Sequence, residues 1–192
     1  MPLGDGFPEV LAAAQAGSAA AWESLLGELA GAVVGYLRVR GAGDPEATAG
    51  EVFLDMARSI GRFAGDESGF RAWAFVIAHR RLVDDRRRRS RRREVPLAPR
   101  DLPERPAPDS VEDEAVGRAS LEEARRLLDT LSADQAEVIT LRFLAGFTLD
   151  ETAQVLGKRV GSVKSLQHRG LAALRRQIDA RGRIPGDGTG DY

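Results

Sequence analysis

Two segments of the sequence concentrate side chains that bind nucleic acid. The stretch from Lys158 to Arg176 holds six lysines and arginines, with His168 and no acidic residue, and the stretch from Arg80 to Arg93 holds nine arginines against two aspartates. Lysine and arginine neutralise phosphates and can donate hydrogen bonds to base edges. The net charge of −1 does not exclude a nucleic-acid partner, because charge acts where it is concentrated.

No residues suit bond-making chemistry. The chain has no cysteine and only two histidines, His79 and His168, which lie far apart in sequence. This composition excludes disulfides and thiolate zinc sites and argues against a histidine metal site. The sequence shows no nucleophile motif and no phosphate-binding loop. We therefore expect neither an enzyme nor a cofactor, a metal or a small-molecule substrate.

The sequence also predicts where the chain is found. No stretch approaches the roughly 20 apolar residues that cross a bilayer, and residues 1–10 lack the basic and then apolar pattern of a secretory signal. We expect a cytoplasmic protein with no membrane insertion.

An all-α fold must position the two basic segments, because apolar residues recur at spacings of three and four and strand signals are scarce. We expect helices to begin after Ser18, at Asp44-Pro45, after Ser68 and after Ser132. The residues expected inside are Trp22, Leu25, Leu26, Leu29, Val33 and Leu37, then Val52, Phe53, Met56 and Ile60, then Phe70, Trp73, Ile77 and Leu82, and finally Val138, Ile139, Leu141 and Phe143.

A proline-rich segment separates two helical domains. Five prolines and many charges lie between Glu94 and Asp113, so this stretch cannot bury enough apolar surface to order itself. We expect a first domain at 1–93, a flexible linker at 94–112, a second domain at 113–180 and a disordered tail at 181–192.

The second domain contains a helix-turn-helix pattern. Thr148 to Gly157 reads as a short helix with a capping box and a terminal glycine, and a second helix follows from Val160. In DNA-binding proteins with this pattern the second helix enters the major groove. The alternative is a helical hairpin with a solvated basic face; the long stretch without acids favours DNA binding. We expect Val163, Leu166, Leu171 and Leu174 inside, and Ser162, Lys164, Ser165, His168 and Arg169 outside.

The long helix of the first domain mixes arginines with aromatic residues. This mixture is typical of proteins that bind single-stranded nucleic acid, in which rings stack on bases and guanidinium groups follow the phosphates. Phe70 and Trp73 also have the spacing of core residues, so both interpretations of Trp73 stay open. The residues that carry the pattern are Arg71, Trp73, Phe75, His79, Arg80 and Arg81.

Taken together, these segments resemble the extracytoplasmic-function (ECF) class of bacterial RNA polymerase sigma factors. Asp44 to Leu54 resembles the polymerase-binding helix of the family, and Phe70 to Asp84 resembles its promoter-melting helices. Leu131 to Phe143 and Gly146 to Arg175 are similar to its reader of the upstream promoter box. Two positions depart from the family pattern: Gly50 stands in place of a usual glutamine, and His79 in place of a common asparagine.

The resemblance implies a promoter-specificity subunit that acts with core RNA polymerase and promoter DNA and is controlled by a separate anti-sigma factor. Glu51, Asp55 and Arg58 would face polymerase, with Phe53 and Leu54 as anchors or core. The loop from Gly61 to Gly69 and the helix after it would hold the minus-ten element. The implied minus-ten residues are Phe63, Arg71, Trp73, His79, Arg80 and Arg81, and the implied minus-thirty-five residues are Arg159, Ser162, Lys164, Ser165, His168 and Arg169.

A conventional helix-turn-helix regulator that acts without polymerase is the alternative. Such a protein usually dimerises to read two half-sites, and the sequence has no evident zipper or ligand-binding domain. A stable 1:1 complex with core polymerase would separate the two hypotheses.

Overall fold

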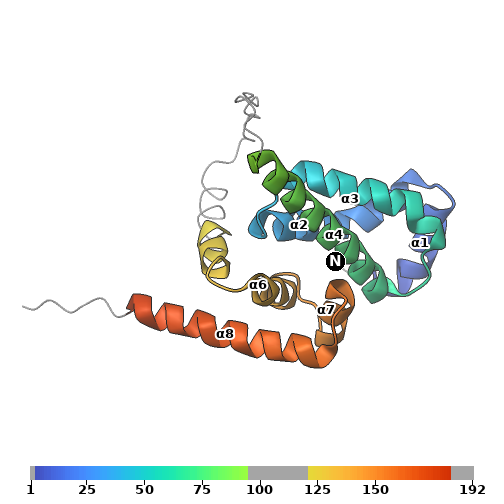
Figure 1. Ribbon diagram of the computed structural model, residues 1–192. Coiled ribbons are helices and arrows are strands. Elements are labelled where there is room, and N and C mark those ends of the chain that lie inside the picture. Colours follow the sequence, from blue (N-terminus) through green and yellow to red (C-terminus); the bar gives the residue numbers. More distant parts are fainter. Residues whose placement is uncertain (1–2, 95–120, 183–192) are drawn as a thin grey trace, which may run out of the picture.

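The structure is a computed structural model that describes residues 3–94 and 121–182. The regular elements of these residues are helical (Figure 1), which confirms the all-α prediction. The predicted linker at 94–112 and tail at 181–192 lie outside the described residues, apart from Glu94 and the last two residues of the final helix. Within the described ranges, no helix is long and apolar enough to cross a membrane.

Within residues 3–94 the first domain contains four α-helices and two short 3₁₀ turns, and the described part of the second domain, residues 121–182, is also helical. In chain order the first domain holds η1 (Gly4–Gly6), α1 (Phe7–Gln15), α2 (Ala19–Val39), α3 (Pro45–Ser59), η2 (Ile60–Arg62) and α4 (Glu67–Glu94). The second holds helical residues 121–128, α6 (Ala133–Ile139), a π-helical turn η3 (Thr140–Leu144), α7 (Leu149–Leu156) and α8 (Val160–Gly182).

The predicted helix starts are confirmed at three positions and wrong at one. Ser18 and Asp44 accept hydrogen bonds from backbone N–H groups three residues on, and Ser132 forms a full capping box. The long helix, however, begins at Glu67 rather than after Ser68. Asp66 accepts the Gly69 N–H at 2.7 Å, so an aspartate two residues earlier caps this helix.

The core of the first domain lies where α2, α3 and α4 meet, with α1 packed against α2. Leu37, Val52, Met56, Phe75 and Leu82 have no exposed surface there. Each such side chain contributes about 1.5–3 kcal/mol through burial. This packing fixes the position of α4, and the other faces of the helix present the candidate site residues.

The helix-turn-helix of the second domain has the predicted geometry. Thr148 and Glu151 form the capping box of α7, and Gly157 ends that helix in the left-handed region at φ +61°. Only glycine adopts this conformation without strain. The Lys158 N–H closes the turn on the Ala153 carbonyl at 2.9 Å, and α8 then begins.

Two residues expected inside the second domain lie outside. Phe143 is 55% exposed, because the wide turn η3 shifts the phase of the side chains and brings Phe147 inward instead. Leu171 is 40% exposed. The place against Ile139 belongs to Gly170, where a Cβ atom would come within 3.1 Å of the isoleucine side chain.

The two domains pack directly on each other. α7 lies against α4, on the side away from α3 (Figure 1). The buried ring of Phe147 meets Phe75 edge to face, with 4.8 Å between ring centres. Leu141 and Val155 join the same buried cluster as the first-domain core. One apolar core therefore runs through both domains.

Candidate polymerase and nucleic-acid interfaces

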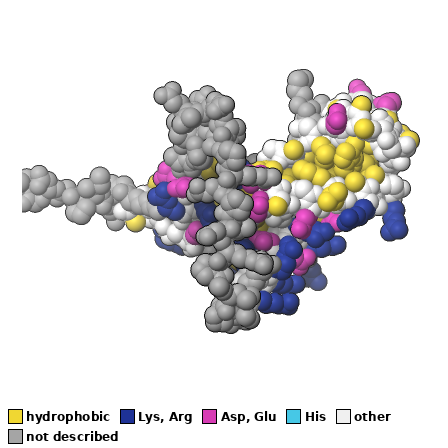
Figure 2. Space-filling view, turned by 90° about the horizontal axis from the view of Figure 1, so that it is seen from above, with side chains coloured by type: hydrophobic (Ala, Val, Ile, Leu, Met, Phe, Trp, Pro, Cys, Tyr) yellow, Lys and Arg dark blue, Asp and Glu magenta, His cyan; other side chains and the backbone are white. Residues whose placement is uncertain are grey.

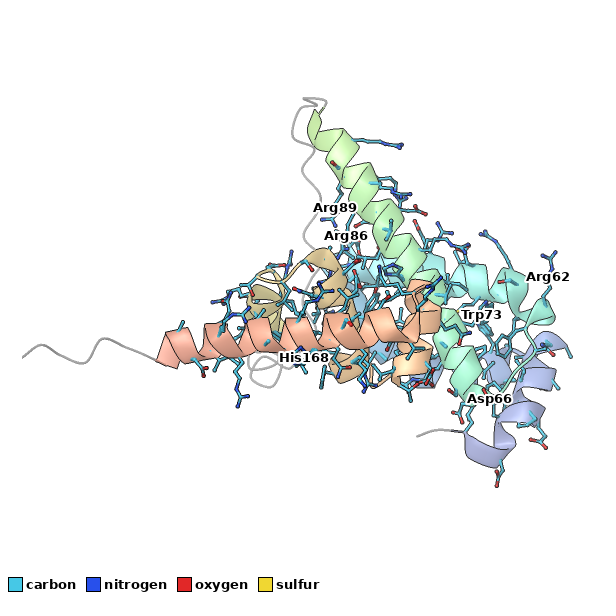
Figure 3. The ribbon with its side chains drawn as sticks, turned by 60° about the horizontal axis from the view of Figure 1, so that its bottom comes forward. Arg62, Asp66, Trp73, Arg86, Arg89 and His168 are labelled. Carbon is cyan, nitrogen blue, oxygen red and sulfur yellow. The ribbon has the colours of Figure 1, made fainter. Side chains whose placement is uncertain are left out.

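The outward face of α8 carries the predicted minus-thirty-five residues. Val163 is fully buried against Val138 and Ala153, which fixes how the helix is turned. The opposite side is exposed at all six predicted positions: Arg159, Ser162, Lys164, Ser165, His168 and Arg169. Figure 3 shows His168 on this long helix. The fold brings the six residues together on one solvent-facing surface.

An acidic residue from α6 borders this surface, which the sequence did not suggest. Asp134 lines an open groove beside Arg159, Ser162 and Arg169. Its carboxylate lies 3.0 Å from the Lys158 ammonium group. Lys158 is thereby held at the edge of the groove, and the carboxylate would repel phosphates from that edge.

An aromatic cluster occupies the turn between α3 and α4. The Phe63 ring stacks on Trp73 with 5.2 Å between centres and meets Phe70 edge to face at 5.4 Å. Phe70 is buried, whereas Phe63 and Trp73 are half-buried. Arg62 and Asp66 flank this turn (Figure 3). The structure thus places both predicted aromatic residues together at the surface of the first domain.

Two of the predicted minus-ten residues contact the second domain. The Arg71 guanidinium donates to the Ala145 carbonyl and lies over the Phe147 ring at 5.0 Å. The Nδ1 atom of His79 lies 3.0 Å from the Tyr36 hydroxyl, inside the interface between the domains. Arg71 and His79 therefore lie on the face of α4 that the second domain covers.

The other predicted residues of α4 point elsewhere. Arg80 is exposed to solvent. Arg81 turns toward α3, where it donates to Asp55 at 2.7 Å and to Glu51 at 3.2 Å. The six predicted minus-ten residues thus do not share a single open surface.

The predicted polymerase face of α3 is partly engaged and partly free. Glu51 and Asp55 pair with Arg81. Leu54 is 57% exposed and Arg58 is also exposed, whereas Phe53 is half-buried against the core. Figure 2, seen from above, shows hydrophobic side chains gathered on the first domain beside a border of arginines.

Two arginines of the basic run have a structural role that the sequence pattern did not reveal. Arg86 donates to the Arg40 carbonyl and Arg89 to the Gly41 carbonyl, each at 2.6 Å. These carbonyls follow the end of α2, where backbone acceptors lack helical partners. Figure 3 shows both arginines on the second half of α4.

A buried carboxylate joins the two domains. Glu137 of α6 is only 4% exposed, and Arg40 and Arg86 each reach its Oε1 atom at 3.1 Å. The Tyr36 hydroxyl donates to Oε2 at 2.9 Å, and His79 Nδ1 lies 3.7 Å from the same oxygen, too far for a good hydrogen bond. Every one of these partners belongs to the first domain.

The surroundings of Glu137 keep it ionised. Burial acts to raise the pKa of this carboxyl, but the contacts with His79 and Arg40 outweigh burial and lower the pKa to about 2. Burial, followed by the charge of Glu137, raises the pKa of Tyr36 well above its usual value, so Tyr36 remains a donor. Since that hydroxyl gives its only proton to Glu137, it accepts its second hydrogen bond from Nδ1–H of His79.

Comparison with known proteins assigns the family. Residues 14–92 match Sigma-70 region 2, and residues 127–176 match Sigma-70 region 4. The ECF RNA polymerase sigma factor BldN of Streptomyces coelicolor is 38% identical over 181 residues, covering 90% of this chain and 67% of BldN. The chain belongs to the ECF RNA polymerase sigma factors. SigD of Mycobacterium tuberculosis is 32% identical over 187 residues, and this match covers 93% of the present sigma factor and 87% of SigD.

Solved structures share the fold of this sigma factor. CnrH, in complex with the cytosolic domain of CnrY, aligns with a TM-score of 0.69 at 24% identity, over 92% of this chain and 99% of CnrH. RpoE of Bartonella quintana, in complex with the anti-sigma factor NepR, aligns with a TM-score of 0.63 at 21% identity. The alignment covers 82% of this chain and 96% of RpoE. Family membership makes the sigma factor a transcription initiation factor rather than an enzyme.

Within the described ranges, no group of three or more His, Cys, Asp or Glu side chains could hold a metal ion.

Proposed function

We propose that this sigma factor binds core RNA polymerase through α3, holds the minus-ten element with the aromatic turn and α4, and reads the minus-thirty-five element with α8. The division into domains at 1–93 and 113–180, joined by a linker at 94–112, is part of the proposal. The observation that carries it is the match to region 2 and region 4 in one chain, with the exposed basic face of α8 inside the region 4 match.

The contact with polymerase centres on Leu54 and Arg58. Both side chains are exposed on α3 and have no role in the core. Glu51 and Asp55 already form ion pairs with Arg81, so their carboxylates are fully available to polymerase only when these ion pairs break. An exposed leucine beside charged residues suits the centre of an interface, where apolar side chains supply most of the affinity.

The minus-ten element would lie along the start of α4. Phe63 and Trp73 offer ring surface for stacking on unpaired bases, and Arg80 is free to contact phosphates. Arg71 and His79 join this surface only when the second domain moves away, because their side chains now contact it.

The minus-thirty-five element would lie along α8. Lys164 and Arg169 can donate hydrogen bonds to guanine edges or to phosphates. Ser162 and Ser165 can contact base edges or phosphates. The short α7 and the glycine turn hold α8 in the position of a recognition helix.

A separate anti-sigma factor completes the proposal. The solved relatives CnrH and RpoE are each in complex with a second protein, and the partner of RpoE is the anti-sigma factor NepR. An inhibitor that engages both linked domains would gain affinity from effective concentration, so that neither contact needs to be tight.

Formation of a 1:1 complex with core RNA polymerase tests the proposal. In size-exclusion chromatography the purified chain should co-elute with core enzyme, and Leu54→Glu should weaken the complex at least tenfold, since a carboxylate would enter an apolar contact. Ile178→Glu is the matched control: Ile178 has the same 57% exposure but lies on α8. If the unmodified chain forms no complex with core polymerase, the proposal is wrong.

A further inference from the structure

We propose that the second domain inhibits the first within the same chain, and that Glu137 is the latch that holds the two together. The inference deepens the proposed function, because it rests on Arg71 and His79 being minus-ten residues. With the latch closed, both side chains are withheld from DNA; with the latch open, both are free.

The latch is a carboxylate surrounded by hydrogen-bond donors from the opposite domain, two of them cationic. Arg40 and Arg86 reach its Oε1 atom at 3.1 Å, and Tyr36 reaches Oε2 at 2.9 Å. A carboxylate that accepts from two guanidinium groups has the chemistry of a phosphate bound by arginines. Glu137 therefore occupies the place on the first domain where a DNA phosphate could bind.

A second set of contacts covers the other end of the same α4 face. Arg71 donates to the Ala145 carbonyl and packs over Phe147. Ser68 donates to Glu151, whose second oxygen caps α7 by accepting the Thr148 N–H. The covered face thus extends along α4 from Ser68 to Arg86.

The ion pairs of the latch can be exchanged for water, whereas the apolar contact between Phe75 and Phe147 stabilises the closed form and must also be exposed on opening. When the domains separate, Glu137 and its arginine partners lose their contacts with each other and form hydrogen bonds with water instead. A buried ion pair contributes little net stability compared with the cost of leaving one partner alone. Opening also frees Arg40, Arg71, His79 and Arg86 together, and DNA phosphates can then replace the carboxylate.

Polymerase can reach the closed chain first. The exposed Leu54 lies on α3, and α3 packs on the opposite side of α4 from α7 (Figure 1). Docking on α3 therefore does not require the second domain to leave. We infer an order in which polymerase binds to the closed chain and the minus-ten surface opens afterwards.

Interdomain distance measures the latch directly. The chain has no cysteine, so Glu23→Cys on α2 and Arg176→Cys on α8 provide two unique labelling sites, both exposed. Spin labels at these sites should give one narrow distance in the unmodified chain. Glu137→Gln and Tyr36→Phe break the latch from opposite domains, and each should raise the open population about tenfold or more, as expected for coupling energies of this kind. Glu123→Gln, an exposed neighbour in the second domain, is the matched control and should change nothing.

Run-off transcription with core polymerase on a mapped promoter is the second measurement, and the two latch variants should initiate several-fold faster than the unmodified chain. A distance distribution in the unmodified chain as broad as that of Glu137→Gln would overturn the latch. So would Tyr36→Phe and Glu137→Gln variants that both stay closed with full helix content. If the distances respond but no form of the chain supports transcription, the closure stands and the role in initiation fails.

Discussion

The hydroxyl of Tyr36 on α2 donates a 2.9 Å hydrogen bond to the carboxylate of Glu137 on α6, a residue 101 positions further along the chain. Tyr36 is 2% exposed, so its hydroxyl has no access to bulk water in this arrangement. The bond therefore ties the core of the region 2 domain to α6 of the helix-turn-helix domain.

Removal of one partner from the buried ion pair should be costly. In the closed chain, Glu137→Leu leaves the guanidinium of Arg40 buried without its carboxylate, so we expect the closed form to lose about 3–5 kcal/mol relative to the open form. The interdomain distance distribution of the spin-labelled chain measures the resulting shift toward the open form.

The double variant Arg40→Leu/Glu137→Leu is the control for that loss. Arg86, the other cation on Glu137, has a side chain that is 34% exposed and can turn to water. The double variant should therefore lose less than the sum of the two single variants. Strict additivity would contradict the assigned pairing.

Acid should open the interface. The pKa of Glu137 is about 2 in the closed chain and rises toward its ordinary 4.5 once the carboxylate is solvated. A lowered pKa stabilises the closed form above the solvated value and loses that effect as the pH falls toward 2. The interdomain distance should thus lengthen below about pH 4.5.

The difference between the unmodified chain and Glu137→Gln isolates this effect. Glu151 titrates in the same direction, because hydrogen bonds from Ser68 and Thr148 outweigh burial and lower its pKa. Only the unmodified chain should show the contribution of Glu137. An identical acid response in both chains would assign the opening to other carboxylates.

Single substitutions on α8 should separate base reading from phosphate binding. Arg169→Ala or Lys164→Ala should cost roughly 1–3 kcal/mol in binding to the minus-thirty-five element if the side chain contacts a base edge, and should relax the preference at one or two positions. Arg176→Ala, exposed further along the same helix, is the control. Binding assays on a library of promoter sequences report both quantities. No loss at Lys164 and Arg169 would make this face an ordinary solvated surface.

Charge reversal on α3 should affect the fold as well as the partner. Asp55→Lys places a cation beside Arg81, which now binds the aspartate, so we expect a lower free energy of unfolding together with weaker polymerase binding. Arg58→Glu changes an exposed residue whose contact with Asp55 is 3.6 Å long, and should weaken polymerase binding with the fold intact. Thermal unfolding of both variants beside the binding assay distinguishes the two effects.

Much of the local structure could be predicted from the sequence. Four helix caps follow from the pattern of a short polar side chain before an apolar stripe, because such a side chain accepts hydrogen bonds from the free backbone N–H groups of the first turn. They are Ser18, Asp44, Ser132 and Thr148. The outward face of α8 could also be predicted, since Val163 fixes the phase of that helix.

The packing of one domain on the other could not be predicted. Glu137 reads as an ordinary acid on a helix surface, and its partners Tyr36 and Arg40 are about a hundred positions away. A regular helix would bury Phe143, whereas the π-helical turn exposes it and buries Phe147. Local periodicity carries no information about either event, because both depend on contacts between distant segments.

Run-off transcription from a promoter library measures promoter-specific initiation itself. Purified chain, core RNA polymerase and a genomic promoter library are combined, and transcript starts are mapped. If the chain is a promoter-specificity subunit, transcripts start from a defined set of promoters, require the chain, and are reduced by Arg169→Ala or Leu54→Glu, while Ile178→Glu leaves them unchanged. Transcript starts no different from those of core polymerase alone would contradict this role.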